Sequence, residues 1–194
     1  MGVEKTGGIY PVQDEKDLVR RAQAGDKEAF AQLYESHFDR IYRYVAMKTG
    51  NRTEAEDMTQ QVFVRAYKSV GSYQWRDVPF SAWLFRIAHN QIVDHIRRES
   101  KRPTVWLDET LPIPSDSDPV QEVELKLNME KVAAASRSLT PAQREVISLR
   151  FAGGLSIAEA AQSMKKSEGA IKALQHSAIQ ALRKTLKTGE GHER

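Results

Sequence analysis

The sequence predicts an all-α protein of two small helical domains joined by a flexible, acidic, proline-rich linker. Apolar residues recur at helical spacing on both sides of the chain's middle, and helix-capping residues stand at the ends of these stretches. No stretch carries the signal of a strand. Four of the seven prolines fall in one window, which divides the helices into two sets: Pro103, Pro112, Pro114 and Pro119.

Four helices are expected in the first half, over 15–24, 26–50, 54–69 and 79–102. The first two end at Gly25 and Gly50, a common residue at helix C-termini. Thr53 and Glu56 have the spacing of a capping box and are expected to begin the third helix. The fourth places large apolar groups on one face and basic groups on the other.

The linker is expected over 103–124, where six acidic residues occur without any Lys or Arg. Fully extended, these residues could span about 70 Å. Two domains joined in this way could therefore lie tens of ångströms apart. The expected organisation is a tail (1–14), a first domain (15–102), the linker, a second domain (125–187) and a second tail (188–194).

The second domain is expected to contain four helices, and three of them have clear caps. A helix runs from near Val123 through Ala135, and Thr140, Pro141 and Gln143 begin the next, which reaches about Phe151. Two glycines then precede a capping box of Ser156 and Glu159 for a short helix through Ser163. After a turn over 164–166, Ser167 caps a last helix to about Leu186.

The short helix, tight turn and basic last helix form a predicted helix-turn-helix, whose second helix would enter the major groove. Its inner stripe holds Ile171, Leu174, Ala178 and Leu182, and its outward side chains include Lys172, Gln175, His176 and Arg183. A solvated charged face on an ordinary bundle is the alternative. The tight turn and the near-absence of acids over 164–187 favour DNA binding.

Composition excludes several function classes. With no cysteine, the chain has no thiolate zinc site, disulfide or cysteine nucleophile. No apolar run is long enough to span a bilayer, and the N-terminus lacks a secretory signal, so we expect a cytoplasmic protein without membrane insertion. His89 and His95 are six apart and would not share a helix face as metal ligands do. No enzyme activity, cofactor or metal is expected.

Three motifs, in order, resemble a known family. They are AEDMTQQVFVRAY (55–67), FSAWLFRIAHNQIVDHIRR (80–98), and LTPAQREVISLRF (139–151) followed by GLSIAEAA (154–161). The chain resembles the extracytoplasmic-function (ECF) RNA polymerase sigma factors of the sigma-70 family over 17–186, excepting the linker. The combination is more specific than a lone helix-turn-helix, which many repressors share.

The resemblance implies that the first domain is a sigma region 2 bundle with two binding surfaces. The helix over 54–69 would dock on the clamp of core RNA polymerase through Glu56, Asp57, Gln60, Gln61, Phe63 and Arg65. The segment over 80–98 would bind the minus-ten element as a melted non-template strand through Arg86, His89, Asn90, Arg97 and Arg98. Tyr73 and Trp75 could help to form a base pocket; for Trp75, core packing remains open, whereas Trp83 is expected in the core.

The resemblance further implies that the second domain is a sigma region 4 helix-turn-helix that reads the minus-thirty-five element of duplex promoter DNA. The residues implied are Lys165, Lys166, Glu168, Lys172, Gln175, His176 and Arg183. Many family members carry glycine at the position of Lys165 and arginine at those of Leu174 and Ser177, which puts the turn geometry and some phosphate contacts in question. The acidic linker would thread polymerase channels, although a flexible tether would look similar. An anti-sigma factor is an implied further partner.

A different function remains open, that of a transcription regulator that binds duplex DNA by itself as a dimer. In that case the first domain would serve sensing or dimerisation. A sigma factor would depend on core RNA polymerase for promoter recognition, whereas such a regulator would not.

Overall fold

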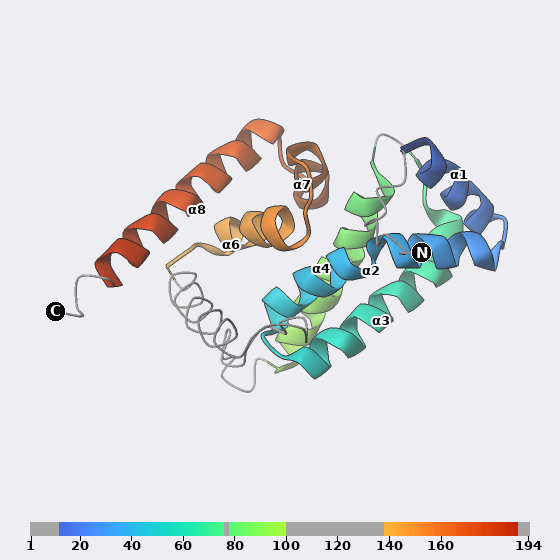
Figure 1. Cartoon of the computed structure of the whole chain (residues 1–194), viewed down its shortest axis with the longest axis horizontal. Coiled ribbons are helices and arrows are strands. Elements are labelled where there is room, and N and C mark those ends of the chain that lie inside the picture. Colours follow the sequence, from blue (N-terminus) through green and yellow to red (C-terminus); the bar gives the residue numbers. More distant parts are fainter. Residues whose placement is uncertain (1–11, 76–77, 100–137, 190–194) are drawn as a thin grey trace, which may run out of the picture.

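The computed structural model describes residues 12–75, 78–99 and 138–189, and within these ranges the regular elements are all helical. Figure 1 shows two sets of helices side by side, α1 to α4 and α6 to α8. The all-α fold class is therefore confirmed. The expected linker over 103–124 and the helix over 123–135 lie outside the described residues.

The first half consists of α1 (Val12–Gln23), α2 (Lys27–Thr49), α3 (Arg52–Ser69), a 3-10 turn η1 (Val70–Ser72) and α4 (Phe80–Glu99). Asp26 caps α2 by accepting hydrogen bonds from the backbone N–H groups of Glu28 and Ala29. Gly50 ends α2 in the left-handed region at φ 68°, as its position in the sequence indicated.

The start of α3 differs from the prediction. The N-cap is Asn51, whose side-chain oxygen accepts a hydrogen bond from the backbone N–H of Glu54 at 3.1 Å, and Arg52 is already helical. Thr53 is therefore inside the helix and does not form a capping box with Glu56. Glu56 accepts instead from Arg52 Nε at 2.9 Å, as an i, i+4 pair.

The second half consists of α6 (Pro141–Ile147), a π-helical continuation η2 (Ser148–Ala152), α7 (Ile157–Met164) and α8 (Glu168–Gly189). Both expected capping boxes are present, Thr140 with Gln143 and Ser156 with Glu159. The Ser167 hydroxyl accepts from the backbone N–H of Ala170 at 3.2 Å and caps α8 as expected. Among the described helices, none combines the length and apolarity needed to cross a bilayer.

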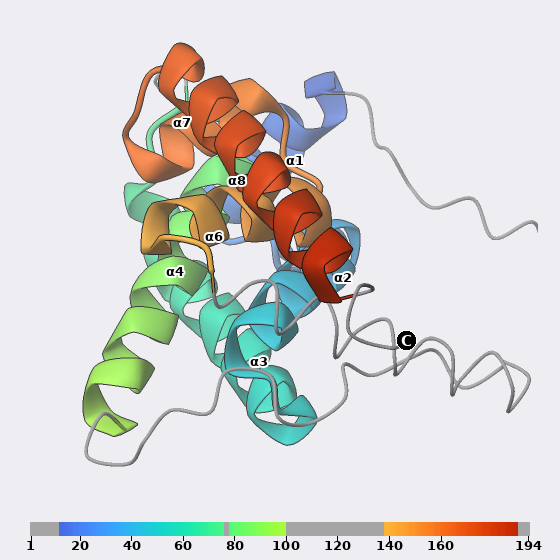
Figure 2. The same cartoon turned by 90° about the vertical axis from the view of Figure 1, so that its left-hand side faces the viewer.

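The two halves share one continuous apolar core, which the sequence did not predict. Helix α7 packs on α4, and η2 packs on α2. Val146, Leu149 and Leu155 belong to the same buried cluster as Tyr44 and Phe85 of the first half. The arrangement can be followed in Figures 1 and 2, in which α6 and α7 lie between α8 and the first half.

Gly153 marks a close approach between the halves. A Cβ atom added there would meet the Phe85 ring at 2.5 Å and the carbonyl oxygen of Leu149 at 2.9 Å. Its φ of −77° is open to any residue, so glycine is required by space and not by backbone conformation. Phe85 is completely buried. The close contact between the halves therefore depends on the absence of a side chain at Gly153.

Candidate nucleic-acid interface

Helices α7 and α8 and the turn between them form the predicted helix-turn-helix. Lys165 ends α7 in the left-handed region at φ 53°, where it is the one described non-glycine residue with a positive φ. The backbone N–H groups of Lys165 and Lys166 donate to the carbonyls of Gln162 and Ala161. The turn therefore forms with lysine at a position where a glycine would carry less backbone strain.

Helix α8 separates an inner and an outer face as its spacing predicts. Ile171 and Ala178 are fully buried, and Leu174 and Leu182 are half-buried. Six of the seven residues predicted to meet the minus-thirty-five element are exposed: Lys165, Lys166, Glu168, Lys172, His176 and Arg183. The basic members of this set form a cationic surface suited to phosphate contacts.

Gln175, the seventh predicted contact, is half-buried and forms a hydrogen bond within the second half. Its Oε1 accepts a hydrogen bond from Arg150 Nε at 3.0 Å, and Arg150 also donates to the carbonyl of Leu155. The amide oxygen of Gln175 is therefore engaged, and its NH₂ group is the part that remains for a base edge. Sequence spacing placed Gln175 outward but gave no sign of Arg150.

The predicted minus-ten residues all lie on α4 but have different surroundings. Asn90, Arg97 and Arg98 are exposed, whereas Arg86 and His89 are half-buried. Arg86 Nη2 donates to the carbonyl of Gln162 on α7 at 3.2 Å. Because Arg86, Asn90 and Arg97 follow each other at spacings of four and seven, they share one face of α4.

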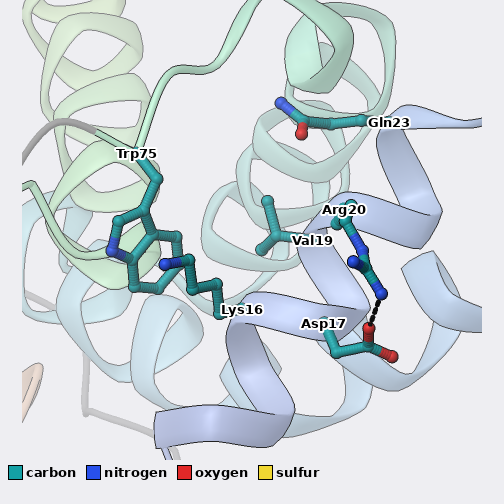
Figure 3. Close-up of a pocket in the computed structure, with 6 residues that line it drawn as sticks. All are labelled: Lys16, Asp17, Val19, Arg20, Gln23 and Trp75. Carbon is teal, nitrogen blue, oxygen red and sulfur yellow. Dashed lines mark hydrogen bonds and ion pairs between the residues drawn. The ribbon is translucent and has the colours of Figure 1, made fainter.

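The loop before α4 brings aromatic rings to the first half. Tyr73 is buried, and its ring lies 5.0 Å from that of Trp83, which packs against the core as expected. Trp75 lies farther out, beside a cavity of about 390 Å³ whose other lining residues belong to α1: Lys16, Asp17, Val19, Arg20 and Gln23. Figure 3 shows Trp75 opposite these side chains, with Arg20 paired to Asp17. The Trp75 side chain therefore forms one wall of this cavity.

Gln23 holds this loop against α1. Its Nε2 donates to the carbonyl oxygens of Val70 at 3.1 Å and Tyr73 at 2.6 Å. The Tyr73 hydroxyl donates to the carbonyl of Val78 at 2.5 Å, on the other side of the loop. These bonds fix the backbone on which Trp75 is carried.

The predicted polymerase-docking face on α3 is exposed except at one position. Glu56, Asp57, Gln60, Gln61 and Arg65 are exposed.

Phe63 is only 4% exposed and packs its ring against Tyr34 at 4.6 Å and Phe38 at 6.2 Å. It is a core residue, contrary to the prediction of an aromatic anchor at the surface. The exposed apolar groups on this helix are Val64 at 52% and Tyr67 at 46%. Val64 lies four residues from Gln60 and three from Gln61, so the three side chains share one face of α3.

A buried charged cluster joins the two halves, and it was not predicted. Glu145 on α6 accepts from the Tyr44 hydroxyl at 2.6 Å and from Lys48 Nζ at 2.5 Å, both on α2, and lies 3.1 Å from His89 Nδ1 on α4. The Glu145 and Lys48 side chains are 9% and 8% exposed. Nothing in the local sequence around Glu145 distinguishes it from an ordinary solvated helix residue.

Electrostatics of this cluster favour the ionised carboxylate. Burial raises the pKa of Glu145, but hydrogen bonds and charge from His89 and Lys48 outweigh it and lower the pKa to about 2. Burial, and then the charge of Glu145, raise the pKa of Tyr44 well above its ordinary value. The phenol therefore stays protonated and donates to the carboxylate.

The chain matches two family models and several characterised proteins. Sigma-70 region 2 matches residues 33–102, and Sigma-70, region 4 matches residues 137–184. The ECF RNA polymerase sigma factor BldN of Streptomyces coelicolor is 39% identical over 171 residues, which cover 88% of this chain and 65% of BldN. The ECF RNA polymerase sigma factor SigW of Bacillus subtilis is 32% identical over 186 residues, which cover 89% of this chain and 96% of SigW.

Among solved structures, CnrH in complex with the cytosolic domain of CnrY superimposes with a TM-score of 0.69 at 26% identity. The match covers 90% of this chain and 98% of CnrH. It therefore includes both halves. With region 2 and region 4 models matched in order and SigW matched over nearly its whole length, the chain belongs to the ECF RNA polymerase sigma factor family.

Proposed function

We propose that the protein binds core RNA polymerase and directs promoter recognition, promoter melting and the initiation of transcription. The observation that carries this function is the presence of separate exposed surfaces on α3, α4 and α8 in a chain of the sigma factor family. A stand-alone regulator would account for α8 but not for the match of residues 33–102 to Sigma-70 region 2.

Each surface has a distinct task in this proposal. The α3 face, with Glu56, Asp57, Gln60, Gln61 and Arg65, docks on the polymerase, and Val64 supplies the apolar contact that Phe63 cannot. On α4, Asn90 reads a base edge, while Arg86, His89, Arg97 and Arg98 hold the backbone of the melted minus-ten strand. On α8, Lys172, Gln175 and His176 lie nearest the bases of the minus-thirty-five element.

The partners in this proposal are core RNA polymerase, promoter DNA in duplex and melted form, and an anti-sigma factor. The solved structure of CnrH contains the cytosolic domain of CnrY, so a similar protein is known to bind another polypeptide. No cofactor is needed for any of these contacts, and we place their action in the cytoplasm, where polymerase and promoters are.

Purified core RNA polymerase provides the decisive test. The chain is expected to co-purify with core and to start single-round transcription from promoters that core alone does not use. A regulator that acts alone would instead protect a palindromic duplex site without polymerase. Footprinting of such a site, together with no binding to core, would overturn the proposal.

Lys172→Ala is expected to weaken promoter recognition by about 1–3 kcal/mol if its ammonium meets a base, and by less if it meets a phosphate. Lys172 is exposed on the outer face of α8, so the change should not affect folding. Open-complex formation on a set of minus-thirty-five variants measures the effect. Lys27→Ala, which changes another exposed lysine at the start of α2, serves as the control. An unaltered preference across the variants would remove Lys172 from base reading.

Trp75→Ala is expected to reduce promoter melting, since base–aromatic stacking is worth about 1–3 kcal/mol per base. Trp75→Phe keeps an aromatic face beside the cavity and should retain most of the activity. The measurement is permanganate reactivity of the minus-ten region in the open complex, compared with binding to a premelted template. Equal melting by wild type and Trp75→Ala would show that Trp75 only packs against its neighbours.

A further inference from the structure

We propose that Arg150 positions the Gln175 amide so that Gln175 presents only hydrogen-bond donors to the minus-thirty-five element and thereby selects guanine at one position of that element. This inference rests on the proposed function, because it names a base that α8 recognises. Its support comes from the contact between Arg150 and Gln175, from the polar contacts that hold α8 around Gln175, and from the hydrogen-bonding pattern of the bases.

The Arg150 side chain determines which end of the Gln175 amide is engaged. Arg150 Nε donates a hydrogen bond to Gln175 Oε1 at 3.0 Å. A guanidinium has donors and no acceptor, so only the oxygen of the amide can occupy this place. Turning the amide over would set its NH₂ group against the N–H of Arg150. The NH₂ group of Gln175 is therefore the end that remains for DNA.

Arg150 is itself held by the backbone of the second half. It lies in η2, where the backbone N–H of Gly153 donates to the carbonyl of Ser148 at 2.9 Å and forms a π-helical turn. Such turns are rare and are frequent at functional sites. Arg150 Nη1 also donates to the carbonyl of Leu155, which precedes the cap of α7. The guanidinium thus connects the segment that leads into α7 with α8.

A second polar contact holds α8 next to Gln175. Gln143 Nε2 on α6 donates to the Ser177 hydroxyl at 3.0 Å, and this hydroxyl donates to the carbonyl of Leu174 at 3.1 Å. The packing of α6 against α8 can be followed in Figure 2. A side chain that is fixed by its neighbours meets its target with a defined geometry. The surroundings of Gln175 therefore suit it to reading a base.

Gln175 lies at the edge of the outer face of α8. It is half-buried, whereas Lys172 and His176 are exposed. Residues three apart on a helix are neighbours, so Gln175 and Lys172 share a side of α8. When this side enters the major groove, the NH₂ group of Gln175 meets a base edge next to the one that Lys172 approaches.

An amide that offers only donors distinguishes the bases in the major groove. Guanine presents two acceptors, N7 and O6, whereas adenine presents N7 beside the N6 amino donor. A glutamine binds both adenine groups only when its oxygen is free to accept, and Arg150 occupies that oxygen. Thymine offers one acceptor, O4, and cytosine offers a donor that would face the donors of Gln175. Guanine is therefore the best match.

Open-complex formation tests this inference, with core RNA polymerase and the full-length chain on promoters that carry each base at each minus-thirty-five position. At one position the wild-type chain is expected to prefer guanine over adenine by on the order of tenfold. Gln175→Leu removes the amide at similar volume and should abolish this preference there, without changing it elsewhere. Gln32→Leu makes the same change at a half-buried position of α2 and should leave every preference unchanged.

Arg150→Met distinguishes a positioning role from a purely structural one. It frees Gln175 Oε1 to accept from adenine, so the preference for guanine over adenine should fall by on the order of tenfold at that position alone. A structural role would lower open-complex formation equally on all promoters. Arg43→Met removes an exposed arginine of α2 and controls for the lost charge.

Gln175→Glu gives a second test that keeps Arg150 in place. One carboxylate oxygen can still accept from Arg150, while the other can accept from the amino group of cytosine. The preference at that position should therefore change from guanine to cytosine. This variant decides the inference if circular dichroism shows that Arg150→Met does not fold.

The outcomes separate this inference from the proposed function. The inference would be overturned if no position depends on Gln175, or if the dependent position prefers a base other than guanine, while transcription from the promoters would still support the proposed function. An unchanged base order in a folded Arg150→Met chain, or in Gln175→Glu, would overturn it as well. A wild-type chain that does not bind core would overturn the proposed function. Footprinting of the free chain on duplex DNA would then decide the base preference, and no footprint would overturn the inference too.

Discussion

Phe63→Ala is expected to lower the free energy of unfolding by about 3–5 kcal/mol, the usual cost of truncating a buried aromatic residue. Phe63 is 4% exposed and its ring meets Tyr34 and Phe38, so the change leaves a cavity between α2 and α3. Urea denaturation followed by circular dichroism measures the loss. Weaker polymerase binding by this variant would then follow from a damaged fold.

Val64→Ala provides the contrast on the same helix. Its side chain is 52% exposed, so the free energy of unfolding should change by less than about 0.5 kcal/mol. Binding to core RNA polymerase should nevertheless weaken, because an exposed apolar group among polar neighbours is suited to an interface centre. A stable Phe63→Ala chain, or a Val64→Ala chain that unfolds, would reverse the assignment of these two residues.

Acidification is expected to weaken the contact between the halves through Glu145. Burial raises its pKa, but His89 and Lys48 outweigh burial and lower the pKa to about 2 from the ordinary 4.5. A group whose pKa is lowered by folding contributes stability that is complete above pH 4.5 and is lost as the pH falls toward 2. The size of the shift corresponds to about 3 kcal/mol.

Comparison with Glu145→Gln isolates this contribution from the other carboxylates. The difference in free energy of unfolding between the two chains should be greatest above pH 4.5 and should shrink as the pH falls toward 2. Tyr44, Lys48 and His89 are the groups that face Glu145 from α2 and α4, and all are retained in the variant. A difference that does not change with pH would mean that the carboxylate is not held ionised by this cluster.

Sequence-based predictions were confirmed where the structure depends only on residues a few positions apart. The capping boxes at Thr140 and Ser156 formed as predicted, because a cap needs only residues three positions apart. At α3 the same reasoning selected Thr53, but Asn51 supplies the cap two residues earlier. Asparagine is also favoured at N-caps, and its side chain reaches the free backbone N–H of Glu54 without a capping box.

The buried and exposed side chains of α3 show what the hydrophobic periodicity of the sequence cannot predict by itself. Phe63 and Val64 are adjacent and both apolar, so a helical pattern places one inward and one outward only when the direction of the core is known. The aromatic residue suggested an interface anchor, yet Tyr34 and Phe38 on α2 enclose it. The packing of α3 against α2 therefore decided which of the two is buried.

By itself, the sequence determined the all-helical class, the helix-turn-helix and the family, because periodicity, caps and ordered motifs are encoded over short stretches. Only the tertiary structure decided that Phe63 is buried, that Arg150 engages Gln175, and that Glu145 joins the halves. Glu145 lies 101 residues from Tyr44 and 97 from Lys48. No local pattern specifies a partner at such a separation, since burial and charge pairing arise only when the chain has folded.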